Sequence, residues 1–367
     1  MREEYELEVL ERYDIEVKST RRIRGAFFCD TNEGTMLLKE TKISGRRAPF
    51  LYLVLSAIEE RGNVKVDTPV FTRDGELLVT SGDGSVYMLK KWYQGRETDI
   101  RQESEIARAA VEMAKLHSEL RQGVTGTGRN GTVRTGQVCD VQVRDGQERN
   151  RQEGNTQGDQ VEIPVVPAGR DPVEEIRRHN RELKKVRAFV RGRVAKNEFE
   201  YLFLDSFEKM YCLAEAVLLR MENSSASELF EESVRCGYLV HGDYNYHNLL
   251  MLRDGMAVTN FEHMRVDIQV RDLYYFMRKV MEKNHWKLKT GQRILESYES
   301  VRRLSDEERE YVGLCLAYPE KYWKTASTYY HSNKAWLPEK YVEKLEIAVR
   351  QNEEKSDFLK KIFHVTL

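Results

Sequence analysis

The sequence lacks the features that would place it in a membrane or on nucleic acid. No apolar run in its 367 residues approaches the roughly 18 residues that a membrane span requires. Lys plus Arg (59) and Asp plus Glu (60) nearly cancel, so the net charge of −1 provides no whole-molecule field to hold nucleic acid or an anionic membrane. We therefore expect no nucleic-acid partner and no membrane span.

The sequence also lacks clustered cysteines and a secretory leader. Its five cysteines form no C-x-x-C pair, and structural zinc needs ligands at such short spacings, so we expect idle thiols in a reducing compartment. The N-terminal stretch MREEYELEVLERYDIEV is acidic and amphipathic, unlike a secretory signal, which predicts synthesis in the cytoplasm. The cysteines are Cys29, Cys139, Cys212, Cys236 and Cys315.

The pattern of apolar residues predicts an α+β protein of two lobes. Residues 1–94 predict a small antiparallel sheet with one packed helix at 46–61. Residues 95–367 predict a larger and mostly helical lobe with a small β patch at 238–262. The β-rich runs of the first lobe fall at 16–28, 35–40, 76–80 and 85–93.

A polar, glycine-rich stretch interrupts the helical lobe. Nine of the 23 glycines lie between Gly123 and Gly169, and no aromatic residue does. Such a segment buries too little apolar surface to offset its ordering entropy. We predict a disordered insertion at 122–170. Its role as a tolerated insertion or as a flexible arm for a partner or for crosslinking stays open.

The most informative stretch is LVHGDYNYHNLLMLRDGMAVTNFE, residues 239–262. Asn248 follows Asp243 by five residues, and a turn at residues 254–255 should return the chain so that Asn260 and Asn248 face one site. Phosphoryl transfer uses such groups: a carboxylate for the acceptor hydroxyl and oxygen ligands for Mg²⁺. The simpler alternative is a capped turn with His241 packed beneath it.

The segment HGDYNYHN resembles the H-G-D-x-x-x-x-N loop of the aminoglycoside phosphotransferase and choline kinase group. The resemblance implies a two-lobed protein-kinase-like fold that binds ATP and Mg²⁺. Asp243 would be the catalytic base, Asn248 would be a metal ligand, and His241 would support the loop.

One position departs from that pattern. The group places a metal-binding Asp in a D-F-[DEG] or D-W-[DE] motif on the next hairpin, where this sequence has Asn260 followed by Phe261 and Glu262. An amide oxygen is a neutral ligand and stabilises a hard cation less than a carboxylate does. Glu262 would substitute in part if its side chain turned inward. The departure predicts weak or absent metal-dependent catalysis.

The same resemblance assigns nucleotide-binding residues in the first lobe. Lys39 ends an apolar strand, where the group has its phosphate-pairing lysine, and Glu59 or Glu60 would be its partner on the following helix. Lys90 and Trp92 lie in the expected hinge. No G-x-G-x-x-G loop is present, so phosphate contacts would fall to the backbone amides of a short turn at residues 24–26 or to Arg22 and Arg24.

Two further runs resemble bacterial spore-coat proteins of the CotS type: YMLKKWYQGRETD at 87–99 and TNFEHMRVDIQVRDLYYFMRKVMEKNHW at 259–286. Asp272 would brace the catalytic loop on that resemblance, although an Asp at this point is also an ordinary helix cap. The resemblance implies synthesis in the mother cell, deposition in the spore coat and other coat proteins as partners.

Two functions follow from these patterns. The first is a spore coat component on a kinase-like scaffold, with nucleotide binding and weak or no catalysis. The second is an active ATP-dependent phosphotransferase whose acceptor is a small hydroxylated or amino substrate or a spore protein. Asn260 and the missing glycine loop favour the first, whereas Asp243, Asn248 and Lys39 support the second.

Overall fold

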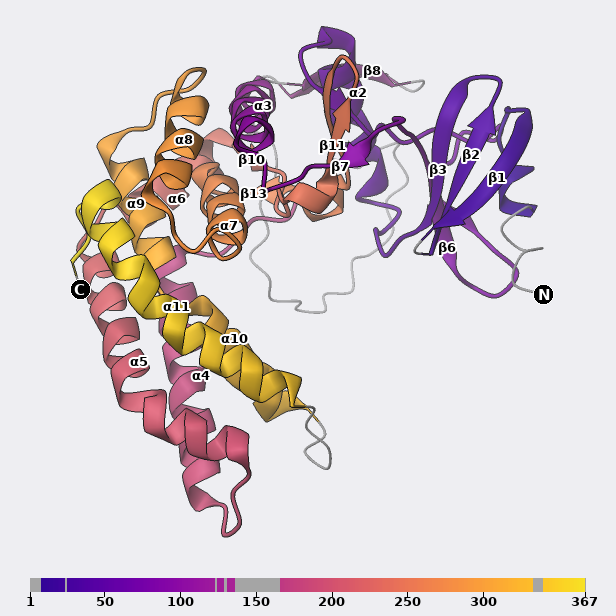
Figure 1. Cartoon of the computed structure of the whole chain (residues 1–367). Coiled ribbons are helices and arrows are strands. Elements are labelled where there is room, and N and C mark those ends of the chain that lie inside the picture. Colours follow the sequence, from indigo (N-terminus) through magenta and orange to yellow (C-terminus); the bar gives the residue numbers. More distant parts are fainter. Residues whose placement is uncertain are drawn as a thin grey trace, which may run out of the picture. The chain divides into compact units, whose positions relative to one another are not determined.

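A computed structural model describes residues 8–23, 25–122, 124–128, 131–135, 166–332 and 339–366 (Figure 1). The described chain divides into two compact units. The first comprises Met1–Asp99, Val111–Gly169 and Val234–Gln269, and the second comprises Ile100–Ala110, Arg170–Ser233 and Val270–Leu367. Most of the predicted insertion at 122–170 lies outside the described residues, as does Cys139, and the lobe boundary at residue 94 stays a prediction.

The first unit contains the predicted antiparallel sheet. Its five strands run in the order β1-β2-β3-β6-β5, with every neighbouring pair antiparallel. The run predicted at 16–28 is two strands, because Gly25 adopts a left-handed φ of 83° and turns the chain there. The strands are β1 (Val17–Ile23), β2 (Ala26–Thr31), β3 (Gly34–Glu40), β5 (Val79–Thr80) and β6 (Val86–Lys91).

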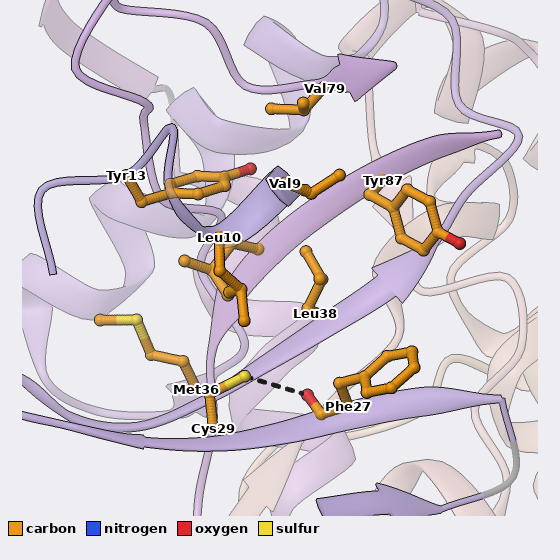
Figure 2. Close-up of a cluster of buried hydrophobic side chains, with 10 residues drawn as sticks. Val9, Leu10, Tyr13, Phe27, Cys29, Met36, Leu38, Val79 and Tyr87 are labelled. Carbon is orange, nitrogen blue, oxygen red and sulfur yellow. Dashed lines mark hydrogen bonds between the residues drawn. The ribbon is translucent and has the colours of Figure 1, made fainter. Parts of the chain in front are cut away.

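One face of this sheet carries a hydrophobic cluster that includes the segment before β1 (Figure 2). Tyr13, Cys29 and Leu38 are fully buried in it. Burial raises the pKa of the Tyr13 hydroxyl to about 12 and that of the Cys29 thiol to about 11, so both groups stay protonated at neutral pH. The Cys29 thiol donates to the carbonyl oxygen of Phe27 at 3.6 Å (Figure 2).

The single helix predicted for this region is α2 (Ala48–Arg61). It has Pro49 in its first turn, where a missing N–H costs nothing, and Gly62 after its last turn. Gly62 adopts a φ of 72°, and its N–H donates to the carbonyls of Ile58 and Glu59. Pro49 and Gly62 therefore mark the start and the end of the helix.

The first unit also contains several short strands. A four-stranded sheet has the order β4-β12-β11-β7, and β10 pairs with β13. The hairpin predicted around Asp254 and Gly255 is confirmed, with Leu252 opposite Gly255 in its register. The elements are β4 (Lys65–Val66), β7 (Arg96–Glu97), β8 (Val124–Gly128), β9 (Gly131–Thr135), β10 (Leu239–Val240), β11 (Leu249–Leu252), β12 (Gly255–Val258) and β13 (Arg265–Val266).

The second unit is helical, as predicted. The Asp171 side chain accepts from the Glu174 N–H and caps α4, and Asn197 and Glu200 form a capping box at the start of α5. Within the described residues, no helix is long and apolar enough to cross a bilayer. The helices of the chain are α3 (Glu103–Arg121), α4 (Pro172–Gly192), α5 (Glu198–Glu222), α6 (Ala226–Cys236), α7 (Val270–Met281), α8 (Leu288–Glu299), α9 (Asp306–Ala317), α10 (Glu320–His331) and α11 (Lys340–Phe363).

The packing of α4 against α10 should be sensitive to acid. The buried His179 ring stacks on Trp323, with ring centroids 3.4 Å apart. Burial, followed by the charge of Arg178, lowers the pKa of His179 from 6.5 to about 4. The unfolded chain therefore takes up a proton on this group at a higher pH than the folded chain, and stability falls as the pH drops from 6.5 towards 4.

We expect His179→Phe to reduce this acid sensitivity while keeping an aromatic ring against Trp323. The loss of unfolding free energy between those pH values should shrink by up to about 3 kcal/mol, at roughly 1.4 kcal/mol per pH unit. Urea titrations at a series of pH values would measure it. Parallel pH profiles for the two proteins would show that His179 does not control the acid response.

Candidate active site

The loop after β10 has a conformation that its sequence requires. Gly242 adopts a φ of 80°, and a Cβ there would lie 2.2 Å from the carbonyl oxygen of His263. The fully buried His241 accepts from the Asp243 N–H at Nδ1, so its other ring nitrogen, Nε2, carries the proton and donates to the Thr259 carbonyl at 2.9 Å. His241 therefore links the loop to the strand end at Thr259 as a neutral ring.

The Asp243 carboxylate is held from two sides. Asn245 Nδ2 donates to Oδ1 at 2.9 Å, and Asn248 Nδ2 donates to Oδ2 at 3.0 Å. Both amides also donate to the Asp243 backbone carbonyl. Asn245 and Asn248 are buried, and Asp243 is half-buried, so one carboxylate is fixed in a single orientation near the surface.

The hairpin brings Asn260 to this loop, as the sequence predicted. The Thr259 N–H donates to the Asn248 carbonyl at 2.9 Å, directly beyond the Leu249–Val258 pair of the β11–β12 ladder. One residue further on, Asn260 Nδ2 donates to Asn248 Oδ1 at 2.8 Å. The two residues proposed as metal ligands are therefore bonded directly to each other.

These contacts extend to Lys39 and form a chain with one direction. Lys39 Nζ donates to Asn260 Oδ1 at 3.1 Å, Asn260 donates to Asn248, and Asn248 donates to Asp243. An ammonium group can only donate and a carboxylate can only accept. Lys39 at one end and Asp243 at the other therefore determine the orientation of the Asn260 and Asn248 side-chain amides.

A buried carboxylate that the motif analysis missed supports Asn260. The Asp67 side chain follows β4, is fully buried, and accepts the Asn260 N–H at 2.9 Å through Oδ2. The same oxygen lies 3.4 Å from Nζ of the buried Lys90. Asn260 adopts left-handed dihedrals, with φ 66° and ψ 53°, which asparagine tolerates better than most residues do. No sequence motif identifies Asp67, which is a single Asp after a two-residue strand.

Glu262 is turned inward and bridges two lysines. Its Oε1 lies 3.5 Å from Lys39 Nζ and 3.4 Å from Lys90 Nζ. Lys90 lies opposite Leu37 on β3, two residues before Lys39, so both lysines project from one face of the sheet. Burial alone would raise the pKa of Glu262, but Lys90 and Lys39 hold it below its usual value. Burial raises the pKa of Asp67, and Lys90 offsets that only in part.

The prediction that Lys39 pairs with Glu59 or Glu60 is wrong. Glu59 Oε1 accepts from Lys91 Nζ at 2.6 Å, and Glu60 is exposed to solvent, whereas Lys39 pairs with Glu262 and Asn260. Lys91 lies on the opposite face of β6 from Lys90, because side chains alternate along a strand. The contact with Glu59 therefore belongs to a different set of side chains from the Lys39 site.

Three other predicted residues have described positions without a demonstrated role. Trp92 follows β6, packs edge-on against Phe28 with ring centroids 5.9 Å apart, and donates its backbone N–H to Thr35. Asp272 is buried on α7 in the second unit, and its bracing of the loop stays a prediction. Of the arginines proposed for phosphate contact, Arg22 is exposed and Arg24 lies outside the described residues.

The residues as arranged do not fit a Mg²⁺ ion. Asn248 Oδ1 and Asn260 Oδ1 both already accept hydrogen bonds, and Glu262 is paired with two lysines. Across the part of the chain that the structure describes, no group of three or more His, Cys, Asp or Glu side chains is placed to hold a metal ion. A hard cation at this point would share these oxygens with the Asn260 amide and would lie close to the Lys39 ammonium group, which repels it.

Comparisons with known proteins agree with this fold. The family described as Spore coat putative kinase YutH matches residues 179–362, half of the chain. Spore coat protein S of Bacillus subtilis (strain 168) is 25% identical over 166 residues, 45% of this chain and 47% of that protein. The match therefore spans about half the length of this curated relative.

Two solved structures share the fold over nearly their whole length. An aminoglycoside phosphotransferase from Alicyclobacillus acidocaldarius superposes with a TM-score of 0.75 at 16% identity, covering 97% of this chain and 96% of that one. The amicoumacin kinase hAmiN, in complex with AMP-PNP, Ca²⁺ and Ami, gives a TM-score of 0.56 at 12% identity over 95% and 96%. The α+β fold is thus that of the aminoglycoside phosphotransferases.

We expect Lys90→Met to destabilise the protein by about 3–5 kcal/mol, because it leaves Asp67 as a buried charge without its cation. Adding Asp67→Asn should recover part of that loss, since the amide oxygen can still accept the Asn260 N–H. The matched control is Lys65→Met, which breaks the exposed Lys65–Asp254 pair and should cost far less, because solvent screens that pair. Urea unfolding would measure all three; equal costs for the two single variants would contradict the role of Asp67 and Lys90.

Proposed function

The chain belongs to the spore coat YutH family, and from that membership we propose that it is a spore coat component built on a kinase-like scaffold. It is made in the cytoplasm of the mother cell and then assembles with other proteins of the coat. The similarity to spore coat protein S supports this location. The kinase-like unit serves mainly as a folded building block, with nucleotide binding and weak or no phosphoryl transfer.

The observation that carries the proposal is the hydrogen bond from Asn260 to Asn248. A metal-dependent kinase of this fold needs oxygen ligands at these two positions for the cation that bridges nucleotide phosphates. Here one amide satisfies the other, and Lys39 satisfies the remaining oxygen. The closed network is stable without a cation, so a nucleotide would bind without help from Mg²⁺.

A second candidate function is an active phosphotransferase. It is favoured by the Asp243 carboxylate, which two amides hold in one orientation, as a fixed catalytic base would need. Its acceptor would be a small hydroxylated or amino compound or a protein of the spore. Mg²⁺-dependent transfer from ATP that Asp243→Ala abolishes would establish this candidate and overturn the first.

We expect Asn260→Asp to create Mg²⁺-dependent nucleotide binding. A carboxylate cannot donate to Asn248 Oδ1, so that oxygen becomes available to a cation and a negative charge is added beside it. Thermal unfolding with ATP, with and without Mg²⁺, measures the change. A ligand at a hundred times its dissociation constant adds about 2.7 kcal/mol and should raise the midpoint by several degrees.

The matched control is Asn32→Asp, which adds the same charge to an exposed turn of the same unit and keeps the acceptor for the Glu16 N–H. It should leave the response to Mg²⁺ as in the wild type. If Asn260→Asp gives no Mg²⁺-dependent shift, the amide is not what limits metal binding. If the wild type already gives the full shift, the closed network does not exclude the cation.

A further inference from the structure

The strongest charge imbalance in the described chain lies on α4 and the turn that follows it, in the second unit, whereas the residues of the candidate site belong to the first unit. Residues 177–196 contain nine basic residues and one acidic residue, a net charge of +8. Because the whole chain carries −1, the rest of it carries −9. A nearly neutral protein therefore holds one compact basic segment.

The helix sorts these charges onto its solvent side. The residues of α4 that face its neighbours are apolar or uncharged, including Leu183, Val186 and Val190, and α5 runs alongside it in the same unit (Figure 1). Five exposed cations lie on the other side at spacings of three or four residues or their multiples. These five residues, called the basic stripe below, are Arg178, Arg181, Lys184, Lys185 and Arg191, and they extend over roughly 20 Å of helix.

The protein does not neutralise the basic stripe. Other cations of the segment have partners: Arg177 pairs with Glu222, and Arg187 with Glu208. Within the described residues, none of the five stripe side chains makes an ion pair with a carboxylate. The one acidic residue of the segment, Glu182, accepts from Trp323 and Ser327 of α10 at 2.8 Å, and its charge acts on Arg178 without forming an ion pair with it.

We propose that the basic stripe docks an acidic polypeptide segment of a partner protein in the spore coat. The proposal rests on the proposed role in coat assembly and names the chemistry of the partner. An acidic helix or extended segment of matching length would place carboxylates opposite the five cations. At the end of the stripe, the turn between α4 and α5 exposes Val194 completely, and Tyr201 is 63% exposed, so a polypeptide also finds apolar contacts there.

The charge distribution favours a short acidic segment over a long polyanion. Charges interact across about 8–10 Å at ordinary ionic strength, so a segment confined to the stripe is attracted by its cations alone. A nucleic acid or an anionic membrane extends past the stripe and meets exposed carboxylates of the same unit, such as Glu198 and Asp205 on α5. The length of the stripe therefore selects the size of its partner.

The test compares the binding of two labelled anions by fluorescence anisotropy at low salt. One is a Glu-rich peptide of about 14 residues, which spans about 20 Å as a helix. The other is a single-stranded oligonucleotide of equal charge. The variant Arg181→Glu/Lys185→Glu reverses two exposed stripe charges, and Lys340→Glu/Lys360→Glu reverses two exposed charges on α11 of the same unit.

We expect the full-length protein to bind the peptide more tightly than the oligonucleotide, with affinity that falls as salt is added. The stripe variant should weaken peptide binding by about tenfold or more, and the α11 variant by less than about twofold. Absence of peptide binding, equal losses in the two variants, or tighter binding of the oligonucleotide would overturn the proposal. The measurement involves no nucleotide or metal, so its failure is separate from that of the Asn260 experiment.

Discussion

The direction of hydrogen bonding from Lys39 to Asp243 is the constraint on which the candidate site depends. An ammonium group at one end and a carboxylate at the other leave the intervening amides of Asn260 and Asn248 only one arrangement in which every bond has a donor and an acceptor. The arrangement fixes the orientation of the Asp243 carboxylate. It also gives each of the two amide oxygens a donor, one of them an ammonium group, so a cation at these oxygens would compete with the contacts that order the loop.

The buried charges behind this chain serve the same arrangement. Asp67 accepts the backbone N–H of Asn260 and thereby stabilises a left-handed residue that would otherwise cost free energy. Its own burial is tolerable because Lys90 lies beside it, and Lys90 in turn shares Glu262 with Lys39. Lys39 and Lys90 therefore have Asp67 and Glu262 as counter-charges within this buried group, and none of these four side chains depends on a bound ion to be neutralised.

The sequence predicts those parts of the site that are set by local chain geometry. The H-G-D loop, the turn at residues 254–255 and the proximity of Asn260 to Asn248 follow from spacing within one stretch of about two dozen residues, and the structure agrees. Spacing could not identify the partner of Lys39. The Lys39 side chain projects from the face of the sheet where Glu262 lies, and Glu59 on α2 pairs with Lys91 instead. The role of Asp67 could not be predicted from the sequence either, because it depends on burial beside Lys90 and not on the spacing of residues along the chain.

The balance of charge within the site bears on where the protein meets anions. Asp67 and Glu262 already compensate Lys39 and Lys90, so a phosphate group arriving there must compete with carboxylates that are in place. Within the described residues the five cations of the basic stripe form no ion pair with a carboxylate, and Glu182 of the same segment is held by α10. A fold whose candidate site supplies its own counter-charges, and whose basic stripe has none from ion pairs within the described residues, is suited to binding another polypeptide. The net charge of −1 does not reveal the basic segment, because its charge of +8 is offset by −9 on the other residues.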